Sequence, residues 1–317
     1  MTLRTAYIFP GQGAQFPGMG KEFFSQFAVA REALEEAEDI LKKPLKQLIL
    51  EGPVELLTKT SNSQIAIFVV SFAILQVIRF RFPHLSPLVN AGLSLGEYTA
   101  IVSAGVLSYQ EALPLVQLRG QLMEKACEKN SGTMAVILGL DAELVEKMVH
   151  QLNLPHDLWA ANFNCPGQVV ISGTEQGIAV GTEAAKKLGA KRVLQLSVAG
   201  AFHSGLMKEA QEQLAPSIDE VAMQAPQSQL VMNVPGDFVY NLDEVRSNLK
   251  KQVTSPVRWE QGIRKMEALG IDFYLEIGPG TTLTGMNKKI PVLSSTLNFQ
   301  SCDDLVSAEN FLRNIKL

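Results

Sequence analysis

The chain has 317 residues, of which 46% are hydrophobic and 19% are charged, and its formal net charge is −4. This composition is typical of a globular protein with a large core, arranged as one big domain or as a large and a small one. A slightly acidic chain has no general attraction for nucleic acid or an anionic membrane surface, so we expect neither as a partner.

The three cysteines, Cys127, Cys165 and Cys302, are far apart in the sequence. An odd and scattered set argues against a disulfide framework or a zinc site and favours a reducing compartment. Residues 1–4 lead directly into a strand-like run without a signal or transit peptide, so we expect a cytoplasmic protein. The most apolar stretch, residues 65–78, is interrupted by polar residues and is too short to span a bilayer, which predicts a buried core helix.

An apolar strand is predicted at residues 5–9, and it runs into the turn Pro10-Gly11-Gln12-Gly13. A glycine turn after a first strand suggests a dinucleotide site, but Phe16 stands where the third glycine of G-x-G-x-x-G belongs, and we reject that interpretation. The two glycines around Gln12 instead allow its backbone N–H to approach a ligand closely. Helical patterns follow at about residues 20–42 and 64–80.

The sequence Gly92-Leu93-Ser94-Leu95-Gly96 is the only G-x-S-x-G in the chain. An apolar run at residues 85–91 precedes it and a helix-competent run at residues 97–104 follows it, which is the strand, turn and helix order of a nucleophile elbow. The flanking glycines allow the tight turn that exposes the hydroxyl of Ser94. N–H groups at the start of the helix would face the negative charge that develops during acyl transfer. Ser94 is therefore the candidate nucleophile.

A further helix is predicted from an N-cap at Ser108 to about Lys129, and it contains Arg119. The helical neighbours of Arg119 are all apolar: Ala112, Leu115, Val116, Leu122, Met123 and Ala126. The guanidinium therefore projects from the buried face of the helix into the core. A charge that cannot be lost needs an anionic partner there. Two interpretations remain open: a structural salt bridge to an internal Asp or Glu, or the binding of a substrate carboxylate.

Residues 129–197 have a different pattern. Strands are predicted at 133–140, 158–164, 168–172 and 191–198, with helices at 141–152 and 174–188. The order β-α-β-β-α-β is that of a ferredoxin-like unit. We therefore predict an α/β protein in which residues 1–128 and 198–317 form a hydrolase-like catalytic domain with a parallel sheet, and residues 129–197 form an inserted ferredoxin-like subdomain.

His203 lies in a loop of small residues directly after the predicted insert. It is the one histidine of four that both follows Ser94 and lies where the chain returns to the large domain, and serine hydrolases place the base downstream of the nucleophile. We take it as the candidate general base. Farther along, a loop at residues 252–259 leads into a helix at 260–269, and a strand at 272–277 ends in a Gly-Pro-Gly turn, which is typical of the ligand edge of an open α/β sheet.

Six motifs stand in the order found in malonyl-CoA:acyl carrier protein transacylases, and the chain resembles that family over nearly its full length. They are Phe9-Pro10-Gly11-Gln12-Gly13, Gly92-Leu93-Ser94-Leu95-Gly96-Glu97, Gln117-Leu118-Arg119-Gly120, Asn162-Phe163-Asn164-Cys165-Pro166-Gly167-Gln168, Gly200-Ala201-Phe202-His203-Ser204 and Glu276-Ile277-Gly278-Pro279-Gly280. The resemblance implies transfer of a malonyl group from malonyl-CoA to the phosphopantetheine thiol of acyl carrier protein by a ping-pong reaction, which supplies fatty acid synthesis. It implies no cofactor and no metal, and we expect a monomer.

Carried over to this chain, the resemblance implies that Ser94 attacks the thioester and becomes malonylated, while His203 accepts its proton and later activates the carrier thiol. The backbone N–H groups of Gln12 and Leu95 would form the oxyanion hole. The backbone carbonyl of Gln252 would orient the imidazole, where a hydrolase uses an Asp.

The resemblance also implies how the acyl group is chosen. Arg119 would hold the malonyl carboxylate by a two-pronged ion pair, and Asn162 would line the pocket. Gly200 and Phe202 resemble the malonyl-selecting form of their loop, so methylmalonyl is the less expected substrate. Leu93 departs from the family, which usually has His at the second position of the elbow. A possible hydrogen bond near Ser94 is thereby lost, and we expect activity to survive.

Three alternatives remain. A serine esterase or thioesterase would use the same Ser94–His203 pair and deliver the acyl group to water, although a buried Arg119 argues against a neutral ester as substrate. A non-catalytic scaffold protein would have no need of these residues. An acyltransferase unit of a polyketide synthase has the same chemistry, but no adjoining domain is present and we expect a free-standing protein. The basic residues expected near the pocket mouth, for an acidic carrier, are Lys191, Arg192, Lys288 and Lys289.

Overall fold

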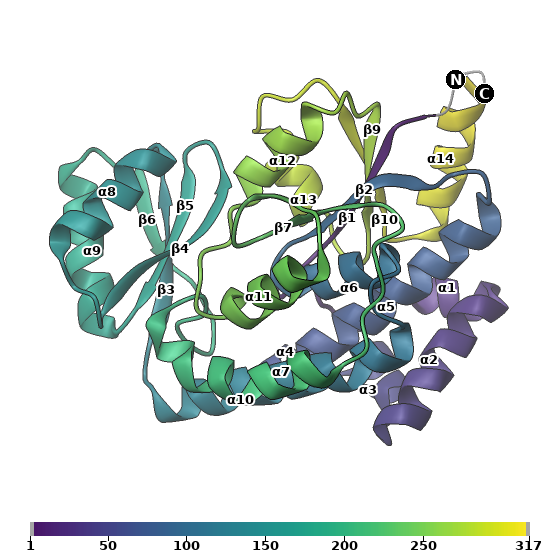
Figure 1. Cartoon of the computed structure of the whole chain (residues 1–317), viewed down its shortest axis with the longest axis horizontal. Helices are drawn as coiled ribbons and strands as arrows, with labels where there is room; N and C mark the ends of the chain where they lie inside the picture. The colour runs from purple at the N-terminus through teal and green to yellow at the C-terminus, as the bar shows by residue number, and fades with distance from the viewer. Residues whose placement is uncertain (1–2, 315–317) are drawn as a thin grey trace. The chain divides into compact units, whose positions relative to one another are not determined.

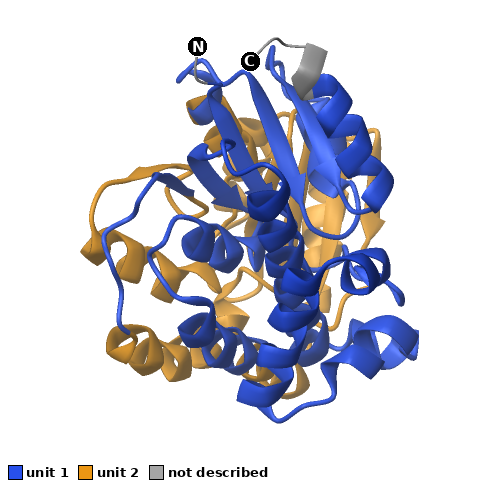
Figure 2. Cartoon of the chain, turned by 90° about the vertical axis from the view of Figure 1, so that its right-hand side faces the viewer, with its two compact units in different colours: residues 1–120, 222–231, 266–317 blue, residues 121–221, 232–265 orange. Residues whose placement is uncertain are grey.

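The structure, a computed structural model, describes residues 3–314 and divides the chain into two compact units. Of the described residues, 3–120, 222–231 and 266–314 form the first unit, and 121–221 and 232–265 form the second (Figure 2). One sheet is mostly parallel and the other antiparallel, so the predicted α/β class with a hydrolase-like parallel sheet and a ferredoxin-like insert is confirmed.

The first unit contains a parallel sheet in the order β10-β9-β1-β2-β7. Its strands are β1 (Thr5–Phe9), β2 (Pro87–Gly92), β7 (Gln229–Met232), β9 (Phe273–Ile277) and β10 (Ser295–Phe299). All five residues of β1 and of β9 are buried, as expected for the middle of a parallel sheet that is covered on both faces. The predicted strand at 5–9 is therefore confirmed, and the turn that contains Gln12 follows it directly.

The helices of the first unit are α1 (Lys21–Gln26), α2 (Ala28–Leu41), α3 (Leu45–Glu51), α4 (Val54–Thr58), α5 (Thr60–Arg81), α6 (Gly96–Ser103), most of α7 (Tyr109–Lys129), α13 (Thr282–Asn287) and α14 (Cys302–Asn314). The helical pattern predicted at 20–42 is present as two helices, because Phe27 takes an extended conformation (φ −119°, ψ 124°) and separates α1 from α2. The cap predicted at Ser108 is present, since its hydroxyl accepts a hydrogen bond from the Glu111 backbone N–H at 3.1 Å.

α5 is the one helix within residues 3–314 that is long and apolar enough to cross a membrane by length and composition. Within the structure, however, 83% of its most apolar window is buried. The helix packs against α2 and β9 in the core of the first unit. This agrees with the core helix predicted from the apolar stretch 65–78.

The second unit contains an antiparallel sheet in the order β4-β5-β3-β6. Its elements are β3 (Thr133–Leu138), α8 (Ala142–Leu152), β4 (Leu158–Cys165), β5 (Gln168–Gly173), α9 (Glu175–Lys187) and β6 (Arg192–Gln195). Figure 1 shows α8 and α9 together on one face of this sheet, where apolar residues of both helices and of the strands form one buried cluster. The predicted β-α-β-β-α-β order is thus confirmed.

The second unit also contains segments that follow the ferredoxin-like part in sequence. They are η1 (Gly205–Met207), α10 (Lys208–Glu220), β8 (Asp237–Val239), α11 (Leu242–Gln252) and most of α12 (Trp259–Glu267). The packing unit is therefore larger than residues 129–197. The domain limits drawn from the sequence, at 128/129 and 197/198, stay a prediction.

Candidate active site

The turn between β2 and α6 has the geometry of a nucleophile elbow. Ser94 lies between them with φ 51°, in the left-handed region that non-glycine residues rarely occupy. A Cβ at Gly92 would lie 2.0 Å from the carbonyl oxygen of Gly96, and a Cβ at Gly96 would lie 2.1 Å from the carbonyl oxygen of Phe9. Any larger residue at these two positions would force the backbone apart. The glycines are therefore what permits a serine to stand at the apex of the turn.

One of the two predicted oxyanion donors, Leu95, lies in this turn, and the other, Gln12, lies in the turn after β1. Leu95 stands at the N-cap position of α6, where backbone N–H groups have no acceptor within the helix, and its side chain is fully buried. Gln12 lies in the turn after β1, which is tied to the elbow by the hydrogen bond from the Leu93 N–H to the Phe9 carbonyl at 3.0 Å. Both residues belong to the first unit with Ser94.

Arg119 projects from α7 and is completely buried, as its apolar helical neighbours predicted. Its guanidinium donates to the Ser94 hydroxyl oxygen at 3.1 Å and to the Gln64 side-chain oxygen at 2.5 Å. It also lies 5.5 Å from the centre of the Tyr98 ring. Burial lowers the pKa of Arg119, whereas the buried Glu97 carboxylate raises it, and a guanidinium keeps its charge in proteins under either influence. A permanent positive charge therefore stands beside the candidate nucleophile.

Gln64 is a site residue that sequence reasoning missed. It lies in the first turns of α5, is fully buried, and uses its carbonyl oxygen to accept from Arg119. Its amide nitrogen donates to the Gln12 side-chain oxygen at 3.5 Å. One side chain thus connects the guanidinium to the predicted oxyanion turn. Gln64 is the last residue of a polar run, 60–64, at the start of α5, and nothing in that run singles it out.

In the second unit, His203 lies directly before η1 with φ 56° and is 4% exposed. Its Nδ1 is 2.9 Å from the carbonyl oxygen of Gln252 and 3.1 Å from that of Ser255. Carbonyl oxygens only accept hydrogen bonds, so Nδ1 must carry the hydrogen and Nε2 is left as the basic nitrogen. The predicted contact with the Gln252 carbonyl is present, and Ser255 supplies a second one that the sequence did not indicate.

The loop that holds His203 is closely packed. A Cβ at Gly200 would lie 2.4 Å from the Cys127 sulfur, so α7 touches the loop backbone there. The buried Ser204 hydroxyl donates to the Ala201 carbonyl at 2.6 Å and accepts from the Leu206 N–H at 3.2 Å, which fixes the turn after His203. Burial raises the pKa of the Cys127 thiol to about 12, an effect that neighbouring glutamates strengthen. This cysteine is therefore a packing residue rather than a nucleophile.

Asn162 lies half-buried on β4 in the second unit. It forms a β-bridge with Val257, and the Val257 carbonyl accepts from the Phe163 N–H at 2.8 Å. β4 is thus joined to the segment that begins with Gln252. The structure therefore brings His203, Gln252 and Asn162 into one unit, and Ser94, Gln12, Leu95 and Arg119 into the other.

The four basic residues considered for carrier docking are all exposed: Lys191, Arg192, Lys288 and Lys289. Among residues 3–314, no group of three His, Cys, Asp or Glu side chains could hold a metal ion.

Comparison with known proteins identifies the family. The model of the acyl transferase domain family matches residues 6–302. A malonyl CoA-acyl carrier protein transacylase of Bacillus subtilis is 42% identical over 90% of both chains, and that of Haemophilus influenzae is 38% identical over 97% of this chain and 98% of its own. The chain belongs to the malonyl-CoA:acyl carrier protein transacylase family.

Solved structures of the family share the whole fold. The transacylase of Clostridium perfringens superposes with a TM-score of 0.94 at 31% identity, covering 99% of this chain and 98% of its own. A malonyl-transacylase solved in complex with the acyl carrier protein of a type II polyketide synthase has a TM-score of 0.92 at 37% identity, covering 97% and 99%. Members of this family are acyltransferases, and this chain is one.

Proposed function

We propose that this enzyme moves a malonyl group from malonyl-CoA to the phosphopantetheine thiol of an acyl carrier protein, through an ester on Ser94, and so supplies fatty acid synthesis. The observation that carries the proposal is the hydrogen bond from the fully buried Arg119 to the Ser94 hydroxyl. A fixed cation beside the nucleophile fits an acyl group that ends in a carboxylate, because opposite charges attract strongly where water is excluded. A neutral acyl group gains nothing from this attraction.

In the first half-reaction, Nε2 of His203 accepts the proton from Ser94 Oγ, which attacks the thioester carbonyl. The N–H groups of Gln12 and Leu95 stabilise the resulting oxyanion, and each donor in such a site is worth about 3 kcal/mol of barrier. The carbon–sulfur bond then breaks, and CoA leaves as the thiol with the proton from His203. Arg119 holds the malonyl carboxylate throughout.

In the second half-reaction, His203 accepts the proton of the carrier thiol, whose sulfur attacks the ester carbonyl. The ester bond breaks, and Ser94 regains its proton from His203. Gln252 orients the imidazole through its backbone carbonyl and Asn162 lines the pocket. These steps use no metal and no cofactor beyond the substrates. We further propose a cytoplasmic monomer that consists of a catalytic domain (1–128 and 198–317) and a ferredoxin-like subdomain (129–197).

The backbone support of His203 favours transfer over the hydrolase alternative. A carbonyl dipole stabilises an imidazolium less than a buried carboxylate would, since it carries no net charge. A weaker base activates water less readily, and this leaves the ester time to meet the carrier thiol. Without the two carbonyl contacts on Nδ1, a serine hydrolase would be the better candidate.

Intact mass spectrometry after incubation with malonyl-CoA alone tests the proposal. We expect a stable gain of one malonyl group, which is absent from Ser94→Ala and is discharged by an acyl carrier protein. Steady release of free malonate without an adduct would instead support the hydrolase. No adduct and no turnover would support a scaffold protein.

A further inference from the structure

The orientation of His203 depends on backbone carbonyls, which no substitution removes. The two carbonyls that face its Nδ1 belong to Gln252, where α11 ends, and to Ser255 in the turn that follows. Ser255 N–H also donates to the Gln252 carbonyl at 3.3 Å, so both acceptors belong to one hydrogen-bonded turn. Whatever fixes this turn relative to His203 therefore fixes the imidazole.

Two packed helices, α10 and α11, connect the two sides of this contact. His203 leads through Ser204 and η1 directly into α10, and α11 ends at the turn that presents the carbonyls. Movement of one helix along the other would therefore change the distance between Nδ1 and its acceptors. The side chains that join the two helices are the ones that could prevent it.

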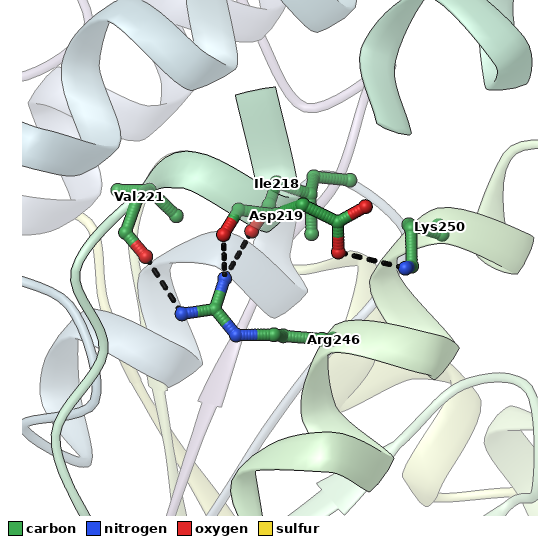
Figure 3. Close-up of polar contacts among 5 residues, drawn as sticks. All are labelled: Ile218, Asp219, Val221, Arg246 and Lys250. Atoms are coloured by element: carbon green, nitrogen blue, oxygen red, sulfur yellow. Dashed lines mark hydrogen bonds and ion pairs between the residues drawn. The ribbon is translucent and has the colours of Figure 1, made fainter. Parts of the chain in front are cut away.

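Arg246 of α11 connects the two helices through three hydrogen bonds (Figure 3). Its guanidinium donates to the carbonyls of Ile218, Asp219 and Val221, at 3.1 Å for Asp219 and 2.8 Å for Val221. These carbonyls lie at the C-terminus of α10, where a helix lacks its own donors and where a cation is favoured. Lys250 adds an ion pair with the Asp219 carboxylate at 2.8 Å. The C-terminus of α10 is thus held to the middle and to the last turn of α11.

Thr254 makes the connection nearest to His203. Its hydroxyl lies 2.6 Å from the side-chain oxygen of Gln211 in α10, and 3.1 Å from the Lys251 carbonyl of its own turn. In the sequence, Thr254 stands between the two residues whose carbonyls face the imidazole. It therefore joins the acceptor turn to the helix that follows His203.

We propose that Arg246 and Thr254 are positioning residues, which hold α11 and its turn against α10 and so keep Nδ1 of His203 on the carbonyls of Gln252 and Ser255. The inference rests on the proposed function, because it takes His203 as the general base. Removal of either connection loosens the imidazole without changing a group that binds malonyl-CoA. We therefore expect kcat to decrease and KM to change little.

Arg246→Met and Thr254→Val test this directly, since they keep side-chain bulk and remove the donors. We expect kcat for malonyl transfer to fall about tenfold with KM for malonyl-CoA changed by less than about twofold, because a small misplacement of a catalytic group slows chemistry strongly. Thr254→Ser keeps the hydroxyl and should retain wild-type kcat. Arg264→Met is the matched control, since it removes an arginine of the same unit whose partner is the nearby Glu260.

A second measurement reports on the imidazole without turnover. In protein with ¹⁵N-labelled histidine, the Nδ1–H of His203 should exchange slowly with solvent, and it should exchange faster in both variants. Variants that melt earlier but keep wild-type kcat and slow Nδ1–H exchange would overturn the proposal and leave Arg246 as a stabilising residue only. If His203→Ala retained full activity, the proposed function would fail, whereas the exchange measurement would still report on the positioning.

Discussion

Arg119→Met is the substitution that examines the choice of acyl group most directly. Methionine fills a volume similar to that of arginine and is a good helix former, so it suits the buried face of α7. The change removes the charge and the donors to Ser94 and Gln64, while the surrounding apolar contacts are kept.

The expected magnitude follows from the burial of the guanidinium, whose exposed fraction is 0%. Loss of one partner of a fully buried ion pair costs about 3–5 kcal/mol. At about 1.4 kcal/mol for each factor of ten, kcat/KM for malonyl-CoA should fall about 140- to 3,700-fold. The hydrogen bond to Ser94 is lost whichever acyl group is bound, so its effect cancels when two substrates are compared.

The assay is the ratio of kcat/KM for malonyl-CoA to that for acetyl-CoA, with a carrier protein as acceptor. We expect this ratio to fall at least about a hundredfold in Arg119→Met, because acetyl-CoA gains from removal of a charge that it cannot pair. Arg81→Met serves as the control, since it removes an arginine whose side chain is 42% exposed and pairs with Glu309. That variant should keep the wild-type ratio.

An unchanged ratio would refute the reasoning. If malonyl and acetyl transfer fell by the same factor, Arg119 would act on the Ser94 hydroxyl and not on the substrate carboxylate. If neither fell, its role would be structural.

Gln252→Ala should keep most of the transfer activity, because a backbone carbonyl contacts the imidazole, whereas His203→Ala should lose it; equal losses in kcat would show that the side chain is what matters. Gly200→Ala should lower both Tm and activity, since the new Cβ would lie 2.4 Å from the Cys127 sulfur, and Cys127→Gly in the same chain should restore part of both. Gly285→Ala, where a Cβ meets nothing within 4 Å, is the control for the thermal melts, and a wild-type Tm for Gly200→Ala would contradict the packing. Burial disfavours the thiolate and raises the pKa of Cys127 to about 12, so alkylation should be very slow at about pH 8 and accelerate as the pH rises towards that value. Fast labelling of the folded protein at about pH 8 would show an accessible thiolate.

Local sequence patterns were sufficient to predict the structure wherever neighbouring residues determine it. The elbow around Ser94 needs two glycines and a strand and helix of ordinary length, and all of these lie within twenty residues. The burial of Arg119 followed from the period of a single helix. The Ser108 cap and the β-α-β-β-α-β order depend in the same way on neighbouring residues.

Contacts between distant segments could not be found by such signals. Gln64 belongs to the site because α5 packs beside the elbow, which no pattern around residue 64 reveals. Ser255 acts through its backbone, so its side chain carries no information about the contact with His203. The break at Phe27 is equally hidden, because the residues on both sides of it are good helix formers. The catalytic and binding roles of the site residues stay predictions until the variants above are measured.

The central position of β1 has a consequence for the way the protein is made. Thr5 pairs with Pro87 on one side and with Phe273 on the other, so β1 needs as its neighbour a strand that is synthesised much later. At a synthesis rate of about 5–20 residues per second, β9 emerges about 10 to 50 seconds after β1. During that interval an apolar strand has an unsatisfied edge. β1 therefore lacks one of its two neighbouring strands until residues 273–277 have been synthesised.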